Sequence, residues 1–181
     1  PVVCSMAAVG IIWSILLDGN IGFIPYLLEK VGIHGAMFFR DPHMAMPTVI
    51  AMTVWKNFGY TMSILVVGIQ GISSSYYEAA AMDGAGKVRQ FFSITIPLLK
   101  QTLGFCLITN TIGSLQVFDQ VYVTTQGGPQ YKTETLVQYI YKNGFNEPYE
   151  LGYACALSVL LLILILIISM PMYKNMFMKQ D

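Results

Sequence analysis

Residues 159–168 read VLLLILILII, an unbroken run of aliphatic side chains. The surrounding segment, 151–173, contains no Asp, Glu, Lys or Arg. A helix of about 20 largely apolar residues is long enough to cross the hydrocarbon core of a bilayer. This segment therefore predicts a membrane-spanning helix and, with it, an integral membrane protein.

Three further segments meet the same requirement or nearly do. Segment 46–70 has one charged residue, Lys56, and segment 98–118 has one, Lys100. Segment 1–17 has none, but it is short, and its apolar run starts at Pro1 without the basic region of a signal peptide. We therefore expect a truncated N-terminus that lacks earlier spans. The sequence predicts an all-α integral membrane protein with about four transmembrane helices in a single domain, residues 1–181.

The composition agrees with a lipid environment. Hydrophobic residues make up 55% of the chain and charged residues 11%, whereas a soluble domain carries about 25% charge. The net charge of zero gives no indication of a nucleic-acid partner. The cysteines stand in apolar stretches without the spacing of a metal site or disulfide framework. We interpret them as small buried hydrophobic residues and expect no metal site and no cofactor: Cys4, Cys106 and Cys155.

The loops between the predicted spans are 18–43, 71–97 and 119–150. In the last, residues 127–129 (Gly-Gly-Pro) indicate a turn, and helical spacing of apolar residues predicts a short helix over 133–143, ended by Asn143 and Gly144. The Lys and Arg counts differ little between the two sides, which weakly places loop 71–97 in the cytoplasm and the other two loops outside. The cytoplasmic side would hold Lys87, Arg89, Lys100, Lys174 and Lys179, and the outer side Lys30, Arg40, Lys132 and Lys142.

Loop 71–97 is polar and rich in small residues, although long apolar segments flank it. Ser75 and Glu78 have the spacing of a capping box, and the alanines 79–81 favour a helix. Gly84 and Gly86 can end that helix in a left-handed conformation. A second short helix is expected over 87–94, anchored by Phe91, Phe92 and Ile94, with Pro97 leading into the next span. The pattern predicts a helix–turn–helix outside the bilayer with an alanine face that a partner can approach; an ordinary amphipathic connector is the alternative.

The same loop resembles the EAA motif of ABC importer permeases, which reads Glu-Ala-Ala, three residues, Gly, nine residues and Ile-x-Leu-Pro. The matching positions include Glu78, Gly84 and Pro97, and Ile96 replaces the usual Leu. The resemblance implies a type I ABC importer permease fold, in which this loop forms a coupling helix that docks on a cytoplasmic ATPase subunit. The coupling residues it implies are Glu78, Ala79, Ala80, Asp83, Gly84, Ile94 and Pro97.

A finer similarity covers most of the chain from about residue 41 onward. Segments 77–85, 118–122, 127–129 and 134–137 are similar to the carbohydrate-uptake group of these permeases, the maltose-transporter F type of subunit. The similarity implies a multi-pass subunit of a prokaryotic inner membrane. It also implies a second permease subunit, two cytoplasmic ATPase subunits and an external solute-binding protein as partners.

Polar side chains within the predicted spans are candidates for lining a solute path. Asn110 and Ser114 share one helix face, Tyr60 shares another with Lys56, and Gly59 allows close backbone approach. Hydrogen bonding between helices is the alternative role for such residues. The resemblance points to the same stretches, 58–62 and 110–117. The candidates are Phe58, Gly59, Tyr60, Met62, Asn110, Ser114 and Val117.

The predicted function is that of a sugar-importing transport subunit that is not itself an enzyme. The sequence has no Gly-x4-Gly-Lys-Ser/Thr phosphate-binding motif, so ATP hydrolysis is expected on partner subunits. The alternatives are a permease for another small solute, such as glycerol phosphate or an amino acid, and an ion-coupled secondary transporter. The latter class usually carries ionisable residues within its spans, where only Lys56 is a candidate. An intramembrane hydrolase is weaker still, because His34 and His43 fall in a loop without a nucleophile–base set.

Overall fold

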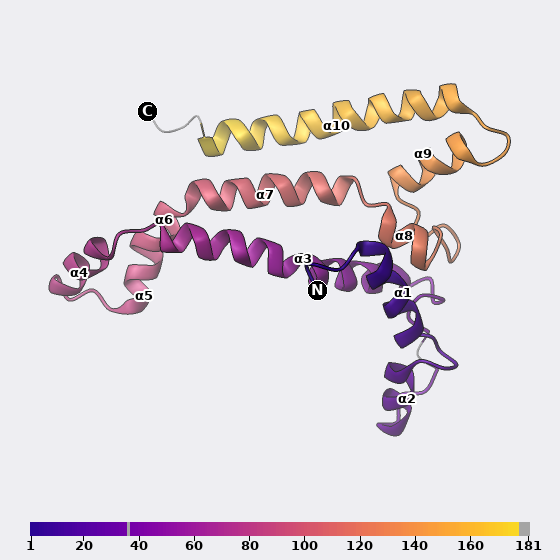
Figure 1. Ribbon diagram of the computed structural model, residues 1–181, viewed down its shortest axis with the longest axis horizontal. Coiled ribbons are helices and arrows are strands. Elements are labelled where there is room, and N and C mark those ends of the chain that lie inside the picture. Colours follow the sequence, from indigo (N-terminus) through magenta and orange to yellow (C-terminus); the bar gives the residue numbers. More distant parts are fainter. Residues whose placement is uncertain (36, 178–181) are drawn as a thin grey trace. The chain divides into compact units, whose positions relative to one another are not determined.

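The computed structural model describes residues 1–35 and 37–177, and every regular element in that part of the chain is helical (Figure 1). The all-α prediction is therefore confirmed. The elements are α1 (Met6–Leu16), α2 (Phe23–Lys30), α3 (Ala45–Gln70), α4 (Ser74–Met82), α5 (Lys87–Gln90), the π-helix η1 (Phe91–Thr95), α6 (Ile96–Leu98), α7 (Lys100–Leu115), α8 (Asp119–Thr124), α9 (Leu136–Phe145) and α10 (Leu151–Phe177).

Two helices, α3 and α10, are long and apolar enough to cross a bilayer. They correspond to the predicted spans 46–70 and 151–173, extended at one end each. The predicted span 98–118 is shorter as a straight helix: α7 begins at Lys100, after a 65° bend from the segment Lys87–Leu98, and the bent pair could form a third span. The helix in segment 1–17 is apolar but only 11 residues long.

The loops hold more helix than the sequence predicts. Segment 18–43 contains α2, and segment 119–150 contains α8 as well as the expected short helix. That expected helix, α9, begins at Leu136, where Thr135 Oγ1 accepts a hydrogen bond from the Gln138 N–H at 3.3 Å. It continues past Asn143 and Gly144 to Phe145, so the predicted end is wrong. A Cβ on Gly144 would lie 3.1 Å from the Ala154 Cβ, so this glycine permits close packing and does not end the helix.

The chain divides into two compact units, and each is described separately. Unit 1 comprises residues 1–59 and 114–163. Its core includes the fully buried Met52 and Val121, and α1 packs on α8. The Trp13 and Trp55 ring centroids lie 5.7 Å apart, joining α1 to α3. A few apolar side chains of the short helices, such as Val9 of α1, are buried here, while many others on these helices stay exposed.

The turn predicted at residues 127–129 is held by buried hydroxyl groups of unit 1. Thr133 is 0% exposed, and its Oγ1 donates to the Gly128 carbonyl at 2.6 Å. The same oxygen lies 2.7 Å from Thr125 Oγ1. Gly127 has a φ of +89°, a conformation that glycine adopts without steric penalty. The loop is thus an ordered element that is fixed by its own side chains.

Unit 2 comprises residues 60–113 and the part of the chain from 164 onward. Glycines sit where its helices approach each other closely. A Cβ on Gly68 of α3 would lie 2.9 Å from Leu99 Cδ2, and a Cβ on Gly104 of α7 would lie 2.6 Å from Met176 Sδ of α10. Small residues at helix contacts are typical of membrane proteins, where close packing replaces the hydrophobic effect.

The cysteines are buried only in part. Cys106 of α7 is 5% exposed, as the sequence predicts. Cys4 and Cys155 are exposed in the isolated chain, so the prediction of burial is wrong for these two. Cys4 precedes α1 and Cys155 lies within α10, and both of these apolar helices have many exposed apolar side chains. Around Cys4 and Cys155, the apolar composition therefore reflects an exposed apolar surface and not a buried interior.

Candidate functional site

The loop predicted as a coupling element forms α4, a turn at residues 83–86, and the arm α5–η1–α6 (Figure 1). Helix α4 is capped by Ser73, whose Oγ accepts a hydrogen bond from the Ser75 N–H at 3.4 Å. The predicted capping box with Ser75 as the cap is therefore wrong. Ser73 has the extended backbone that a cap requires, and Glu78 lies beyond the first turn of the helix.

Gly84 ends α4 in the left-handed conformation that the sequence predicts, with a φ of +75°. The Ala85 N–H donates to the Ala80 carbonyl at 2.9 Å, and the Gly84 N–H donates to the Ala81 carbonyl at 3.0 Å. These two bonds form a Schellman motif. Gly86 does not adopt the predicted left-handed conformation. Its φ is −67°, and it is the N-cap residue of α5, which begins at Lys87.

The second arm is not the single short helix predicted over 87–94. An α-helical turn, α5, continues into the π-helix η1, whose following residue, Ile96, donates its N–H to the Phe91 carbonyl. Phe91 and Phe92 pack edge to face at 5.3 Å but remain 49% and 63% exposed, so they do not anchor the arm as expected. The buried residue is Thr95, at 6% exposure. Pro97 lies in α6, just before the bend into α7.

Side-chain hydrogen bonds join α4 to the second arm, and sequence reasoning missed all of them. The Tyr77 hydroxyl lies 2.9 Å from Thr95 Oγ1. Gln90 Nε2 donates to the Ala85 carbonyl at 2.9 Å and to the Tyr77 carbonyl at 3.5 Å. The three side chains are polar residues close to the motif, but no spacing rule connects residues this far apart in sequence.

Helix α4 and the turn after it carry two exposed acidic side chains. Glu78, Ala79 and Asp83 are exposed, and Met82 is 90% exposed at the end of α4. Within the described residues, neither carboxylate has an ion-pair partner. The other predicted coupling residues lie further in: Ala80 and Ile94 are half-buried. Helix α4 and the turn therefore present two unpaired carboxylates, two alanines and a methionine to a potential partner.

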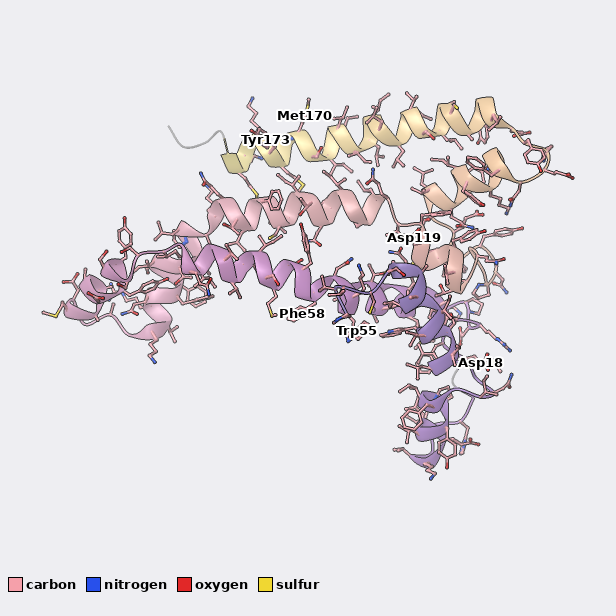
Figure 2. The ribbon with its side chains drawn as sticks, in the orientation of Figure 1. Asp18, Trp55, Phe58, Asp119, Met170 and Tyr173 are labelled. Carbon is pink, nitrogen blue, oxygen red and sulfur yellow. The ribbon has the colours of Figure 1, made fainter. Side chains whose placement is uncertain are left out.

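The solute-path candidates are divided between the two units. In unit 1, Phe58 is 64% exposed (Figure 2), and a Cβ on Gly59 would lie 2.7 Å from Val2 Cγ2. Ser114 is exposed, and the carbonyl of the half-buried Val117 accepts a hydrogen bond from Thr135 Oγ1 at 2.7 Å. Gly59 thus leaves room for the Val2 side chain, while the close backbone approach predicted from the sequence stays a prediction.

In unit 2, Tyr60 and Met62 are 54% and 48% exposed on α3. Asn110 Nδ2 of α7 donates to Thr61 Oγ1 of α3 at 3.3 Å and to the Cys106 carbonyl at 2.7 Å. The first of these bonds is the interhelical contact that the alternative interpretation predicts. Asn110 therefore joins two helices, whatever else it does.

Unit 1 also contains a cavity of about 390 Å³, lined by polar and apolar residues alike, that the sequence did not indicate. Asp18 (Figure 2) accepts a hydrogen bond from Arg40 at 3.1 Å on its wall. The backbone N–H groups of Asn20 and Ile21, together with the Arg40 guanidinium, hold the pKa of Asp18 below its ordinary value. Ser14, also on the wall, has a buried Oγ without a hydrogen-bond partner.

Aromatic rings join α8 to α9 in the same unit. The Tyr122 and Tyr141 ring centroids lie 5.2 Å apart, and a hydrogen bond with Tyr122 raises the pKa of the Tyr141 hydroxyl. Phe118 and Phe145 extend the cluster on either side, at 5.2 Å from Tyr122 and Tyr141 respectively. Ring packing of this kind stabilises by about 0.5–1.5 kcal/mol per pair beyond area burial, so it fixes α9 on α8.

Residues 3–175 match the model of one protein family, the "binding-protein-dependent transport system inner membrane component". The chain belongs to this family. Among curated relatives, it is 37% identical over 161 residues to the sulfoquinovosyl glycerol transport system permease protein SmoG of Agrobacterium fabrum, covering 89% of this chain and 52% of the relative. It is 34% identical over 170 residues to the sn-glycerol-3-phosphate transport system permease protein UgpA of the same organism, covering 93% of this chain and 57% of the relative.

Solved structures show the same fold. A chain of a bacterial ABC transporter involved in the import of the acidic polysaccharide alginate superposes with a TM-score of 0.90, at 22% identity, over 100% of this chain and 63% of that chain. A second structure of the alginate transporter, in complex with an alginate pentasaccharide-bound periplasmic protein, gives a TM-score of 0.87. This permease chain therefore has the fold of ABC importer permeases and spans about half to three-fifths of the length of these proteins.

Membership of the family settles the environment of the long apolar helices. The family consists of inner membrane components, and α3 and α10 have the length and composition of membrane-crossing helices. Many apolar side chains on them are exposed in the isolated permease chain, among them Val67 and Ile167, each at 67%. In a bilayer, such side chains can face lipid tails or neighbouring helices, which are equally apolar.

Proposed function

We propose that this chain is part of the membrane-spanning subunit of an ATP-driven importer, and that α4 with its turn receives the movement of an ATPase subunit. The observation that carries the proposal is the geometry of α4. It is a short helix capped at Ser73 and ended by the Schellman motif at Gly84, with Glu78 and Asp83 exposed and unpaired. The EAA-type spacing and the family membership support the same function.

The partners follow from the same proposal. A solute-binding protein delivers the solute outside the cell, in keeping with the family's binding-protein dependence and with the periplasmic protein bound to the alginate transporter. Two ATPase subunits hydrolyse ATP in the cytoplasm, since the sequence has no phosphate-binding motif of its own. A second permease subunit completes the path. We place loop 71–97 in the cytoplasm and loops 18–43 and 119–150 outside, with four spans in one domain of the type I importer fold.

The proposed solute is a sugar or a sugar-like polyhydroxylated molecule. Two relatives are named for sulfoquinovosyl glycerol and sn-glycerol 3-phosphate, and the structural neighbour for alginate. All three of these solutes carry hydroxyl groups and an acidic group. A sugar is the first candidate for this chain, and a glycerol phosphate or an amino acid is the alternative solute. An ion-coupled secondary transporter is the alternative class.

The function is tested by solute uptake in proteoliposomes that hold the full-length permease with its partner subunits and binding protein. We expect uptake that requires ATP inside the vesicle, and Glu78→Lys should reduce it about ten-fold while Glu78→Gln reduces it less. The reason is that reversal of this exposed charge disturbs a partner contact but breaks no ion pair among the described residues. Uptake driven by an ion gradient without ATP would instead support a secondary transporter, and unchanged uptake by Glu78→Lys would contradict the coupling role of α4.

Asn110 and Ser114 are proposed to line the solute path, with Phe58, Gly59, Tyr60, Met62 and Val117 as further candidates. We expect Asn110→Ala with Ser114→Ala to lower solute-stimulated ATP hydrolysis about three-fold without loss of complex yield, because polar groups that face the solute are removed. The matched control is Thr61→Val, which removes the hydroxyl that Asn110 contacts at 3.3 Å. If Thr61→Val and Asn110→Ala both reduce complex yield and neither changes stimulation, Asn110 serves helix packing alone.

A further inference from the structure

Helix α4 and the second arm lie together without a hydrophobic core between them. No residue of α4 or of α5 is buried. Met82 and Val88, which carry their largest aliphatic side chains, are 90% and 73% exposed. Apolar burial, which usually fixes one helix on another, is therefore nearly absent here. Another interaction must hold α4 against the arm.

The hydrogen bonds of three side chains supply that interaction. Tyr77 in the middle of α4 reaches Thr95 at the far end of η1, with 2.9 Å between the oxygens. Gln90, at the end of α5, donates to the backbone carbonyls of Ala85 and Tyr77 at 2.9 and 3.5 Å. The arm is thus attached to α4 by the Tyr77–Thr95 bond at the far end of η1. At the near end, Gln90 binds the turn at Ala85 and reaches the Tyr77 carbonyl of α4 at 3.5 Å. Thr95 is 6% exposed, so its hydrogen bond with Tyr77 is shielded from competing water.

The π-helix explains how one arm can present both attachments to α4. In an α-helix, residues three or four apart share a face, so residues 90 and 95, five apart, would point in different directions. In a π-helix, the backbone bonds join residues five apart, as Ile96 and Phe91 show. Residues five apart then point in more similar directions than they do in an α-helix. Gln90 and Thr95 are consequently brought to the side that faces α4.

We propose that Tyr77, Gln90 and Thr95 are positioning residues that make α4 and the arm α5–η1–α6 move as one body. A displacement of α4 then reaches the bend at Leu99 and α7 directly, and is not lost in a hinge at residues 83–86. We call this set of three side chains the clamp. The inference rests on the proposed function, because it assigns the clamp a part in passing movement from α4 to the membrane helices.

The test measures coupling in the reconstituted full-length importer as solute imported per ATP hydrolysed. Tyr77→Phe and Thr95→Val each delete one partner of the shared hydrogen bond with little change of shape. Gln90→Glu replaces the donor by an acceptor that faces two carbonyl oxygens. We expect each to lower the ratio about three- to five-fold, with ATP hydrolysis retained. The matched control is Tyr76→Phe, the same chemical change at a neighbouring residue that is 56% exposed and forms no clamp bond.

The double variant Tyr77→Phe with Thr95→Val separates the clamp from unrelated damage. If the two residues act through one bond, the double variant should be no worse than either single variant. Multiplied losses, or equal losses in Tyr76→Phe, would overturn the inference. An unchanged ratio in all clamp variants would overturn it as well, while ATP-dependent uptake by the wild type would leave the proposed function standing.

A second readout does not depend on transport. Amide hydrogen exchange over residues 87–98 of the purified complex should become faster in Thr95→Val and in Gln90→Glu, because the arm opens from α4 more often. Tyr76→Phe should exchange at the wild-type rate. Exchange that is unchanged in both clamp variants would show that these side chains do not hold the arm, whatever the complex transports.

Discussion

Replacing Gly84 with Val is expected to reduce ATP-driven import at least ten-fold while the protein still inserts in the membrane. The backbone of Gly84 has a φ of +75°, which a β-branched residue adopts only under strain. Such strain amounts to about 1–3 kcal/mol, so the Schellman motif at the end of α4 should open or rearrange. The measurement is solute uptake in proteoliposomes, with the amount of inserted permease determined in parallel.

The structure offers a matched control two residues away. Gly86 has a φ of −67° and, like Gly84, no atom within 4 Å of the position where a Cβ would lie. Gly86→Val adds the same side chain to the same turn but fits its backbone, so it should transport within about two-fold of the wild type. If Gly86→Val fails as completely as Gly84→Val, bulk in the turn is harmful and the left-handed backbone is not the cause.

A third variant separates helix termination from partner contact. Asn tolerates the left-handed conformation better than any residue with a β-branched side chain. Gly84→Asn should therefore keep most of the transport activity if the role of Gly84 is to end α4. Should Gly84→Asn transport as poorly as Gly84→Val, a docked subunit must tolerate no side chain at this position, because no atom of the described residues lies within 4 Å of where the Cβ would be.

The sequence predicts well those parts of the fold that depend only on composition or on the backbone preference of a single residue. Helices α3 and α10 follow from apolar length, and Gly84 follows from the left-handed residue that a helix end requires. Neither property depends on what the segment packs against. Both are therefore visible in the sequence alone.

The sequence predictions are wrong where tertiary contacts decide between local conformations that the sequence alone favours about equally. Residues 73–75 are all serine, and Ser73 caps α4 although the spacing to Glu78 favours Ser75. A glycine such as Gly144 often marks the end of a helix, but here the absence of a side chain leaves room for Ala154. The π-helix η1 and the clamp bonds depend on side chains up to 18 residues apart. Periodicity within a segment does not contain that information.

The second large effect is expected at Gly68, where α3 approaches the bend between α6 and α7. A Cβ on Gly68 would lie 2.9 Å from Leu99 Cδ2 and 3.0 Å from two atoms of Thr102. Leu99 is 6% exposed, so its side chain has little room to withdraw. Gly68→Leu overpacks this contact at a cost of about 1–3 kcal/mol, which corresponds to a fall in the melting temperature of the solubilised complex of roughly 5–10 °C.

The direction in which a glycine-to-alanine substitution shifts the melting temperature distinguishes the effect of packing from that of helix propensity. Alanine forms helices better than glycine by about 1 kcal/mol, so Gly113→Ala, with no atom within 4 Å of its Cβ position, should raise the melting temperature or leave it unchanged. Gly68→Ala should lower it, because the Cβ meets Leu99 and Thr102. Thr102→Ala in the Gly68→Ala background removes the atoms at 3.0 Å and should restore part of the loss. An equal rise for Gly68→Ala and Gly113→Ala would show that α3 is not held close to the bend, and that movement of the α6–α7 bend can proceed without α3.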